Sequence, residues 1–176
     1  MKAAAIVALC VLAAVAYGIV HDQVTARVCI EYFTVFHPLI VRSDSPTIQG
    51  LVWGVVATWW VGLPLGVGLA FAALGGKRPP CSMRSLLRPI ATLLAVMAVG
   101  AFVLGCVGYL LGTNGMLQPP RRVAANLHED RHARFLADLW AHNASYWLGL
   151  FGGLVLIGRT WRSRRSIQTS GEVAAG

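Results

Sequence analysis

The chain has 176 residues, enough for one domain, and 56% of them are hydrophobic while only 12% are charged. Soluble domains carry about 25% charged residues, so this composition excludes an ordinary soluble domain and indicates a membrane protein. The formal net charge is +8. Its distribution along the chain indicates whether this charge serves nucleic-acid binding or sets the orientation in the membrane.

Four apolar runs predict an all-α membrane protein with four transmembrane helices. A helix needs about 20 apolar residues to cross about 30 Å of hydrocarbon. The predicted spans cover residues 3–20, 51–75, 90–112 and 139–158, within a single polytopic domain of residues 1–176. The lipid bilayer is then the principal partner of the chain.

The first apolar run also fits a second interpretation. Lys2 precedes an apolar stretch that reaches Ala14-Val15-Ala16, a pattern typical of a cleaved secretory signal. The run continues through Ile19 and Val20, which favours a retained helix. Both interpretations stay open at the level of sequence.

The first outer segment, residues 21–50, predicts a small β element. From Val24 to Phe36 the chain is rich in β-branched and aromatic residues, and the even-numbered positions are mostly apolar. Alternation with a period of two is typical of a strand with one buried face. We therefore expect an extracytoplasmic strand or ribbon that lies on the helix ends.

One stretch carries a resemblance. The sequence YGIVHDQVTARVCIEYFTVFHP (17–38), followed by three further apolar runs and FLADLWAHNASYW (135–147), resembles a set of uncharacterised bacterial inner-membrane proteins. The resemblance implies a four-helix protein of the bacterial inner membrane. It implies no activity, cofactor or catalytic residue.

The apolar runs carry glycine pairs at helix-contact spacing. The pairs are Gly62/Gly66, Gly108/Gly112 and Gly149/Gly153. Small residues four positions apart let helix backbones approach closely. They predict helix packing, either within one chain or between copies in a homo-oligomer or a larger membrane complex.

Charge sorting predicts the orientation. The N-terminus, the loop 76–89 and the tail 159–176 together hold nine basic residues and one acid, a net of +8. The outer segments 21–50 and 113–138 hold six basic and six acidic residues, a net of zero. By the positive-inside rule both termini are cytoplasmic, and the charge reflects topology rather than nucleic-acid binding.

The sequence also contains a metalloprotease-like motif, His128-Glu129-Asp130-Arg131-His132. On a helix, two histidines at i and i+4 share one face and bind Zn²⁺, and the glutamate acts as the general base. A third ligand is needed, and on a straight helix Asp138 would lie about 9 Å along the axis from His132. Asn126 and Glu129 also match a helix-capping pair. A metal pair without protease chemistry is a further alternative.

The outer rim of the bundle offers a second polar cluster. His21 and Asp22 follow the first apolar run directly, and Asp138 and His142 lie i,i+4 at the outer start of the fourth. Ionisable residues at this depth are costly and usually face a partner inside the bundle. Two histidines and two carboxylates suit a divalent metal such as zinc, with copper and iron also acceptable. The alternatives are a proton relay and a structural hydrogen-bond cluster.

Three functional hypotheses follow. The first is a non-enzymatic inner-membrane protein with an outer-rim His/Asp site for a divalent metal, to which Glu31 and His37 are possible additions. The second is a membrane-bound zinc hydrolase in which Glu129 is catalytic beside His128 and His132. The third is a small transporter or an accessory subunit of a membrane complex, although no charged residue lies in the middle of the second or third predicted span.

Overall fold

The structure is a computed structural model that describes the backbone of residues 1–174 and the side chains of residues 1–164. Its helices are α1 (Lys2–Val28), α2 (Pro46–Val56), α3 (Trp59–Leu74), α4 (Met83–Thr113), α5 (Arg121–Ala124) and α6 (His132–Ala174). A π-helical turn spans Tyr32–Phe36, and a 3₁₀ turn spans Glu129–Arg131. The side chains of Arg165 and Glu172, both in the predicted basic tail, lie outside the described residues.

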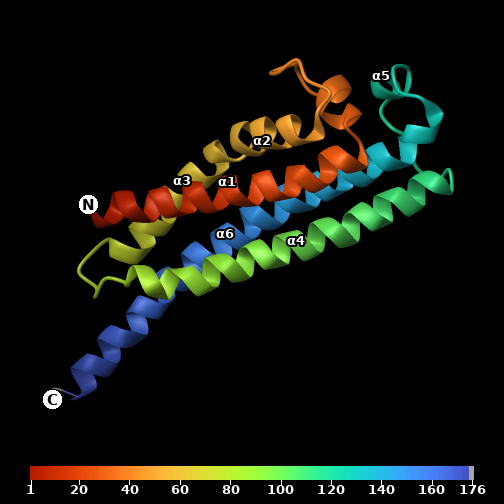
Figure 1. Ribbon diagram of the computed structural model, residues 1–176. Coiled ribbons are helices and arrows are strands. Elements are labelled where there is room, and N and C mark those ends of the chain that lie inside the picture. Colours follow the sequence, from red (N-terminus) through yellow and green to blue (C-terminus); the bar gives the residue numbers. More distant parts are fainter. Residues whose placement is uncertain (175–176) are drawn as a thin grey trace.

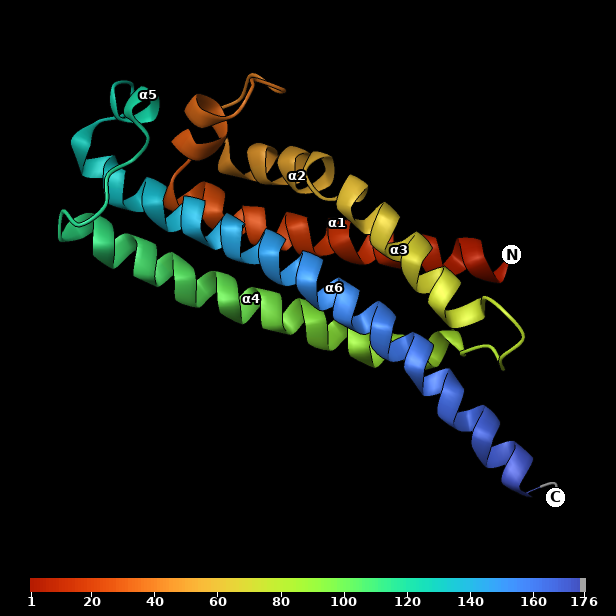
Figure 2. The same ribbon diagram turned by 180° about the vertical axis from the view of Figure 1, so that it is seen from behind.

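The long helices form two packed pairs, in which α2 and α3 follow each other and together make one partner of α1. Helix α1 packs along α2 and α3, and α4 packs along α6 (Figure 1). The pairs meet chiefly where α6 contacts α3, as the reverse view also shows (Figure 2). Both chain ends and the loop between α3 and α4 lie at one end of the bundle. The segments around residues 29–45 and 114–131 lie at the other end, which we call the rim.

Glycines set the distance between the helices of each pair. A Cβ atom on Gly54 of α2 would lie 2.5 Å from the Cα atom of Ile19 in α1, closer than real Cβ contacts. Gly62 and Gly66 of α3 meet α1 in the same way, and Gly108 and Gly112 of α4 meet α6. Two of the three predicted glycine pairs therefore bring helix backbones together within this one chain, whereas Gly149 and Gly153 of α6 face the side chains of Met97 and Leu65.

Three helical segments among the described residues are long and apolar enough to cross a membrane. They are Lys2–Val28, Pro46–Leu74 and Met83–Thr113. Large apolar side chains such as Leu12, Val99 and Phe102 point outward from α1 and α4, as expected of a surface that faces lipid. The chain is a membrane protein by these criteria.

The prediction of four spans is wrong, because the fourth segment does not qualify. Residues 139–158 are helical within α6, but the first part of this stretch carries His142, Asn143 and Ser145, which lower its hydropathy. His142 and Ser145 are buried in the bundle rather than set toward lipid. The count of apolar residues therefore overstated the apolar character of this helix.

The predicted β element is also wrong, since residues 1–174 contain no strand. Helix α1 continues to Val28, and a π-helical turn follows. The buried positions in this stretch recur every three or four residues, which is helical spacing. They are Asp22, Thr25, Ala26, Cys29, Tyr32 and Phe33. The alternation of apolar residues was misleading because it ignored the buried polar side chains of Asp22 and Thr25.

Candidate metal centre

The rim cluster is built by the last turns of α1 and the first turns of α6. His142 Nε2 lies 3.3 Å from Asp22 Oδ1, and the rings of His21 and His142 meet edge to face at 4.7 Å between centroids. One ligand atom from each of His21, Asp22 and His142 lies within 4.8 Å of the others. Three of the four residues proposed as rim ligands are therefore brought together.

Asp138, the fourth proposed residue, is not part of this group of ligand atoms. Its side chain is 1% exposed, and its Oδ2 atom has no hydrogen-bond partner. Burial, together with the charges of Asp22 and Glu31, raises the pKa of Asp138 well above its usual value, although a hydrogen bond from the backbone of Cys29 opposes the shift. Asp138 contacts the cluster through its backbone carbonyl, which accepts a hydrogen bond from His142 Nδ1 at 2.8 Å.

This hydrogen bond fixes the proton on the His142 ring. A carbonyl oxygen only accepts, so Nδ1 of His142 carries the hydrogen. In a neutral imidazole the lone pair is then on Nε2, which faces the carboxylate of Asp22. Two acceptors face each other unless the ring is doubly protonated, the carboxylate is protonated, or a cation lies between them.

The distance between these two acceptors is compatible with a bridging cation. At 3.3 Å the His142–Asp22 contact is longer than most N–H···O hydrogen bonds, which cluster at about 2.7–3.2 Å. Zinc binds imidazole nitrogen and carboxylate oxygen at about 2.0–2.2 Å, so two ligands of a tetrahedral site are about 3.4 Å apart. A histidine ligand commonly donates its other N–H to a backbone carbonyl, as His142 does.

Next to the cluster, a cavity of ≈ 60 Å³ extends toward the middle of the bundle. His21 Nε2 is buried and has no hydrogen-bond partner. The cavity lining includes His21, Asp22 and His142, together with Tyr17 and Ser145, whose hydroxyl groups are 2.7 Å apart. This space exceeds that of one water molecule, so a metal held by three protein ligands would have room for a water as the fourth.

Aromatic rings hold the two imidazoles in place. Tyr32 stacks on His142 at 4.3 Å between centroids, and Tyr17 stacks on His21 at 5.7 Å. Phe33 adds an edge contact to His142. Sequence reasoning missed Tyr32 and Tyr17 as supports. Helical spacing would have indicated Tyr17, which lies one turn before His21, whereas Tyr32 reaches the site only through the π-helical turn.

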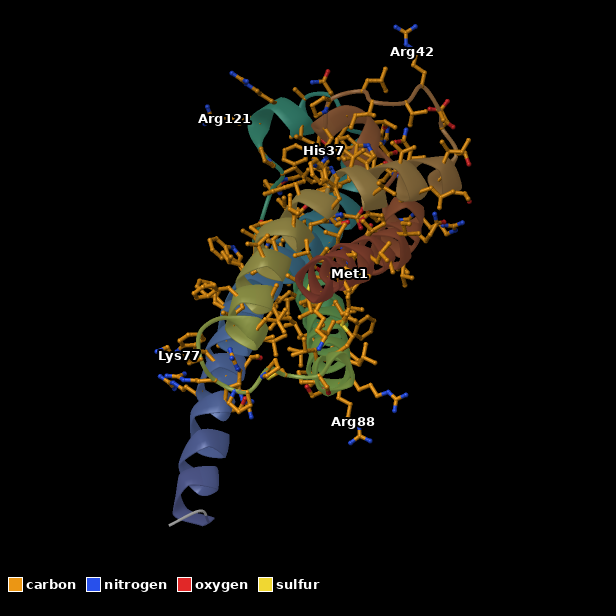
Figure 3. The ribbon with its side chains drawn as sticks, turned by 90° about the vertical axis from the view of Figure 1, so that its left-hand side faces the viewer. Met1, His37, Arg42, Lys77, Arg88 and Arg121 are labelled. Atoms are coloured by element: carbon orange, nitrogen blue, oxygen red, sulfur yellow. The ribbon has the colours of Figure 1, made fainter. Side chains whose placement is uncertain are left out.

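His37 and Glu31 lie outside the ligand group. His37 Nδ1 is 2.8 Å from the carbonyl oxygen of Tyr32, and its ring packs against Trp53 among the crowded side chains at the rim (Figure 3). Glu31 instead accepts two hydrogen bonds from Arg131. Both residues brace the rim without supplying a ligand atom to the cluster.

The metalloprotease-like motif does not form a helical histidine pair. Glu129–Arg131 is a 3₁₀ turn, and α6 begins only at His132. His128 Nδ1 binds Asp130 at 2.7 Å on the surface, while His132 Nε2 lies 3.2 Å from the carbonyl of Leu127. The expected cap also fails, because Asn126 donates its side-chain amide to the carbonyl of Arg122. Glu129 therefore does not lie beside a pair of histidines arranged to bind zinc.

Similarity to known proteins does not identify this chain. No family model, no curated protein and no solved structure matches the chain.

Proposed function

We propose that this membrane protein binds one divalent transition-metal ion at its rim through His21, Asp22 and His142. Two imidazoles and one carboxylate suit zinc, and iron and copper are also chemically acceptable. The protein would act as a membrane-embedded binding protein, and a metal held by these three residues would have room for an exchangeable water on the cavity side.

The hydrogen bonding of the His142 ring supports this proposal most directly. Its Nδ1 donates to the Asp138 carbonyl, so in the neutral ring its Nε2 presents a lone pair to a buried carboxylate. His21 Nε2, a second buried nitrogen, is unpartnered beside them. Buried polar atoms normally have partners, and a cation would satisfy all three ligand atoms at once.

We also propose that the bundle lies in a bacterial inner membrane with both termini cytoplasmic. Helix α6 is too polar in its first part to count among the apolar spans, but it packs along α4 and returns the chain to the end of the bundle where α1 begins. The support is the distribution of charge: the basic loop before α4 and the basic residues in the later part of α6 lie at the end of the bundle where α1 begins. In this orientation the His/Asp cluster faces the periplasmic side. A reporter that is active only in the cytoplasm, fused after Gly176, should be active, and inactivity would contradict the orientation.

Metal analysis of the detergent-purified protein tests the metal site. The wild type should carry about one equivalent of a divalent metal after purification with zinc present. His142→Ala should lose at least nine-tenths of it, because loss of a residue that merely supports a ligand already costs about 10–100-fold in metal affinity. His128→Ala is the matched control, since that histidine is exposed and outside the cluster. It should retain the wild-type content.

A second measurement uses no substitution at the site. Stripping the wild type with a chelator should lower its melting temperature, and zinc should restore it, because a ligand at about 100 times its Kd stabilises by about 2.7 kcal/mol. Negligible metal in the wild type together with a melting temperature indifferent to zinc would overturn the proposal. The cluster would then be an ion-paired contact between α1 and α6.

A further inference from the structure

A second cavity, of ≈ 550 Å³, lies between the first part of α4 and the later part of α6. It is at the end of the bundle opposite the rim. Arg88 and Arg159 contribute charge to its lining, and Ser85 and Thr92 contribute hydroxyl groups. The remaining lining is largely apolar, with Leu93, Leu156 and Val155 among its residues, and it contains no acidic side chain.

The two arginines of this cleft are available to a ligand. Both are exposed, and no ion pair among the described side chains involves either of them. Figure 3, which views this end of the bundle, shows Arg88 reaching outward from α4. Arg164 differs from them, since it is 0% exposed and donates to backbone carbonyls of Ala72, Arg78 and Pro79.

The cleft is amphipathic along the direction of the helices. Arg88 lies close to the start of α4, and Arg159 follows the apolar stretch of α6. Both charges are therefore at the boundary of the apolar region, while Leu93 and Val155 lie further toward its middle. Guanidinium groups match phosphate oxygens in geometry, and basic pockets between membrane helices bind anionic lipid headgroups.

We propose that this cleft binds one anionic phospholipid, with its phosphate on Arg88 and Arg159 and an acyl chain along the apolar wall. A free phosphate would use the arginines but not the wall. A zwitterionic lipid would use the wall, but its own cation would oppose the two guanidinium charges. The charge and the apolar lining together therefore select the anionic lipid.

The test is native mass spectrometry of the full detergent-solubilised protein titrated with phosphatidylglycerol or phosphatidylcholine of identical acyl chains. The wild type should bind one phosphatidylglycerol at least ten-fold more tightly than phosphatidylcholine. Arg88→Gln/Arg159→Gln should weaken phosphatidylglycerol binding about thirty-fold, the effect of two charges near an anionic headgroup. Arg84→Gln/Arg162→Gln is the matched control, since it removes two exposed arginines of the same end that do not line the cleft.

Three outcomes would overturn the site. Equal losses in the two double variants would mean that diffuse basic charge attracts the lipid. Equal binding of the two lipids would mean that the arginines do not recognise the headgroup. Displacement of the lipid by millimolar inorganic phosphate, with no effect of Val155→Trp, would mean that the cleft holds phosphate alone. Val155 is exposed, so this substitution fills the apolar wall without disturbing the core.

Discussion

Arg131 binds Glu31 through two hydrogen bonds, Nε to Oε1 at 3.0 Å and Nη2 to Oε2 at 2.9 Å, across 100 positions of sequence. The pair joins the segment after α1 to the turn before α6. It therefore ties the end of α1 to the start of α6, the two helices that carry the candidate metal ligands. A two-bond arrangement of this kind holds a carboxylate more firmly than a single contact does.

The Glu31–Arg131 pair predicts a pH dependence of stability. Burial raises the pKa of Glu31. The hydrogen bonds from Arg131, from the Glu31 backbone and from the Cys29 thiol, together with the charge of Arg131, outweigh this effect, so the net pKa lies below the usual 4.5. Because the folded pKa is the lower one, the stabilisation is present above the unfolded pKa and disappears as the pH falls through the folded value. Glu31→Gln should lower the free energy of unfolding by about 1 kcal/mol at pH 7.

Thermal unfolding of both proteins across pH checks this expectation. The difference between wild type and Glu31→Gln should shrink as the pH falls below 4.5. A difference that stays constant down to pH 3 would mean that the carboxylate charge does not contribute.

Asp138 and Asp22 should respond differently to the same substitution. Asp138 reaches His142 through its backbone carbonyl, which Asp138→Asn keeps, so this variant should retain its metal. Asp22 supplies a carboxylate oxygen to the cluster, so Asp22→Asn should weaken metal binding by about 10-fold or more. Metal content after dialysis against a graded chelator series measures both. Equal retention in the two variants would remove Asp22 from the ligand set.

The backbone contact between α1 and α2 should tolerate no side chain at Gly54. A new Cβ atom would meet the backbone of Ile19 at 2.5 Å, and backbone cannot rotate away. Gly54→Ala should therefore lower the free energy of unfolding by about 2 kcal/mol. Gly158→Ala is the control, because nothing lies within 4 Å of its Cβ position in α6. That variant should be about 0.5–1 kcal/mol more stable, since glycine weakens helices. Denaturant unfolding in detergent would measure both, and equal stability would refute the contact.

Arg164 should behave as a structural residue. It is 0% exposed and donates to three backbone carbonyls around the loop between α3 and α4. Arg164→Gln leaves these carbonyls without their donor and should cost about 3 kcal/mol. The exposed Arg162→Gln should stay within about 0.5 kcal/mol of wild type. Melting temperatures of the two variants provide the comparison, and similar values would show that the buried contacts are dispensable.

The sequence allowed the rim cluster to be located because apolar length determines depth. Counting forward along the first run and backward from Arg159 set His21, Asp22 and His142 at one level. Rotation about the helix axis was not accessible in this way, so the side chain of Asp138 was expected among the ligands although only its carbonyl contacts His142. Which face a residue presents depends on tertiary packing.

Local irregularities explain the other differences. The π-helical turn that brings Tyr32 onto His142 has no distinctive sequence pattern, and alternating apolar residues in that stretch indicated a strand. Arg164 belonged to the basic tail that the charge distribution assigned to the cytoplasmic side, and that pattern did not indicate that its side chain is buried against backbone carbonyls. Charge alone does not distinguish an arginine that faces solvent from one that binds carbonyl groups.

The division of the bundle into two pairs has a consequence for its biogenesis. Helices α1 to α3 come from one continuous stretch of chain, and α4 to α6 come from the next. The first pair can therefore assemble during translation, before α4 leaves the ribosome. Polar connections between the halves that require α6, the last helix to be made, include His142 with Asp22, Ser145 with Tyr17, and Arg164 with backbone carbonyls of α3 and the following loop. Truncation before α6 would release a nascent protein with a formed first half and without His142, one of the three residues of the His/Asp cluster.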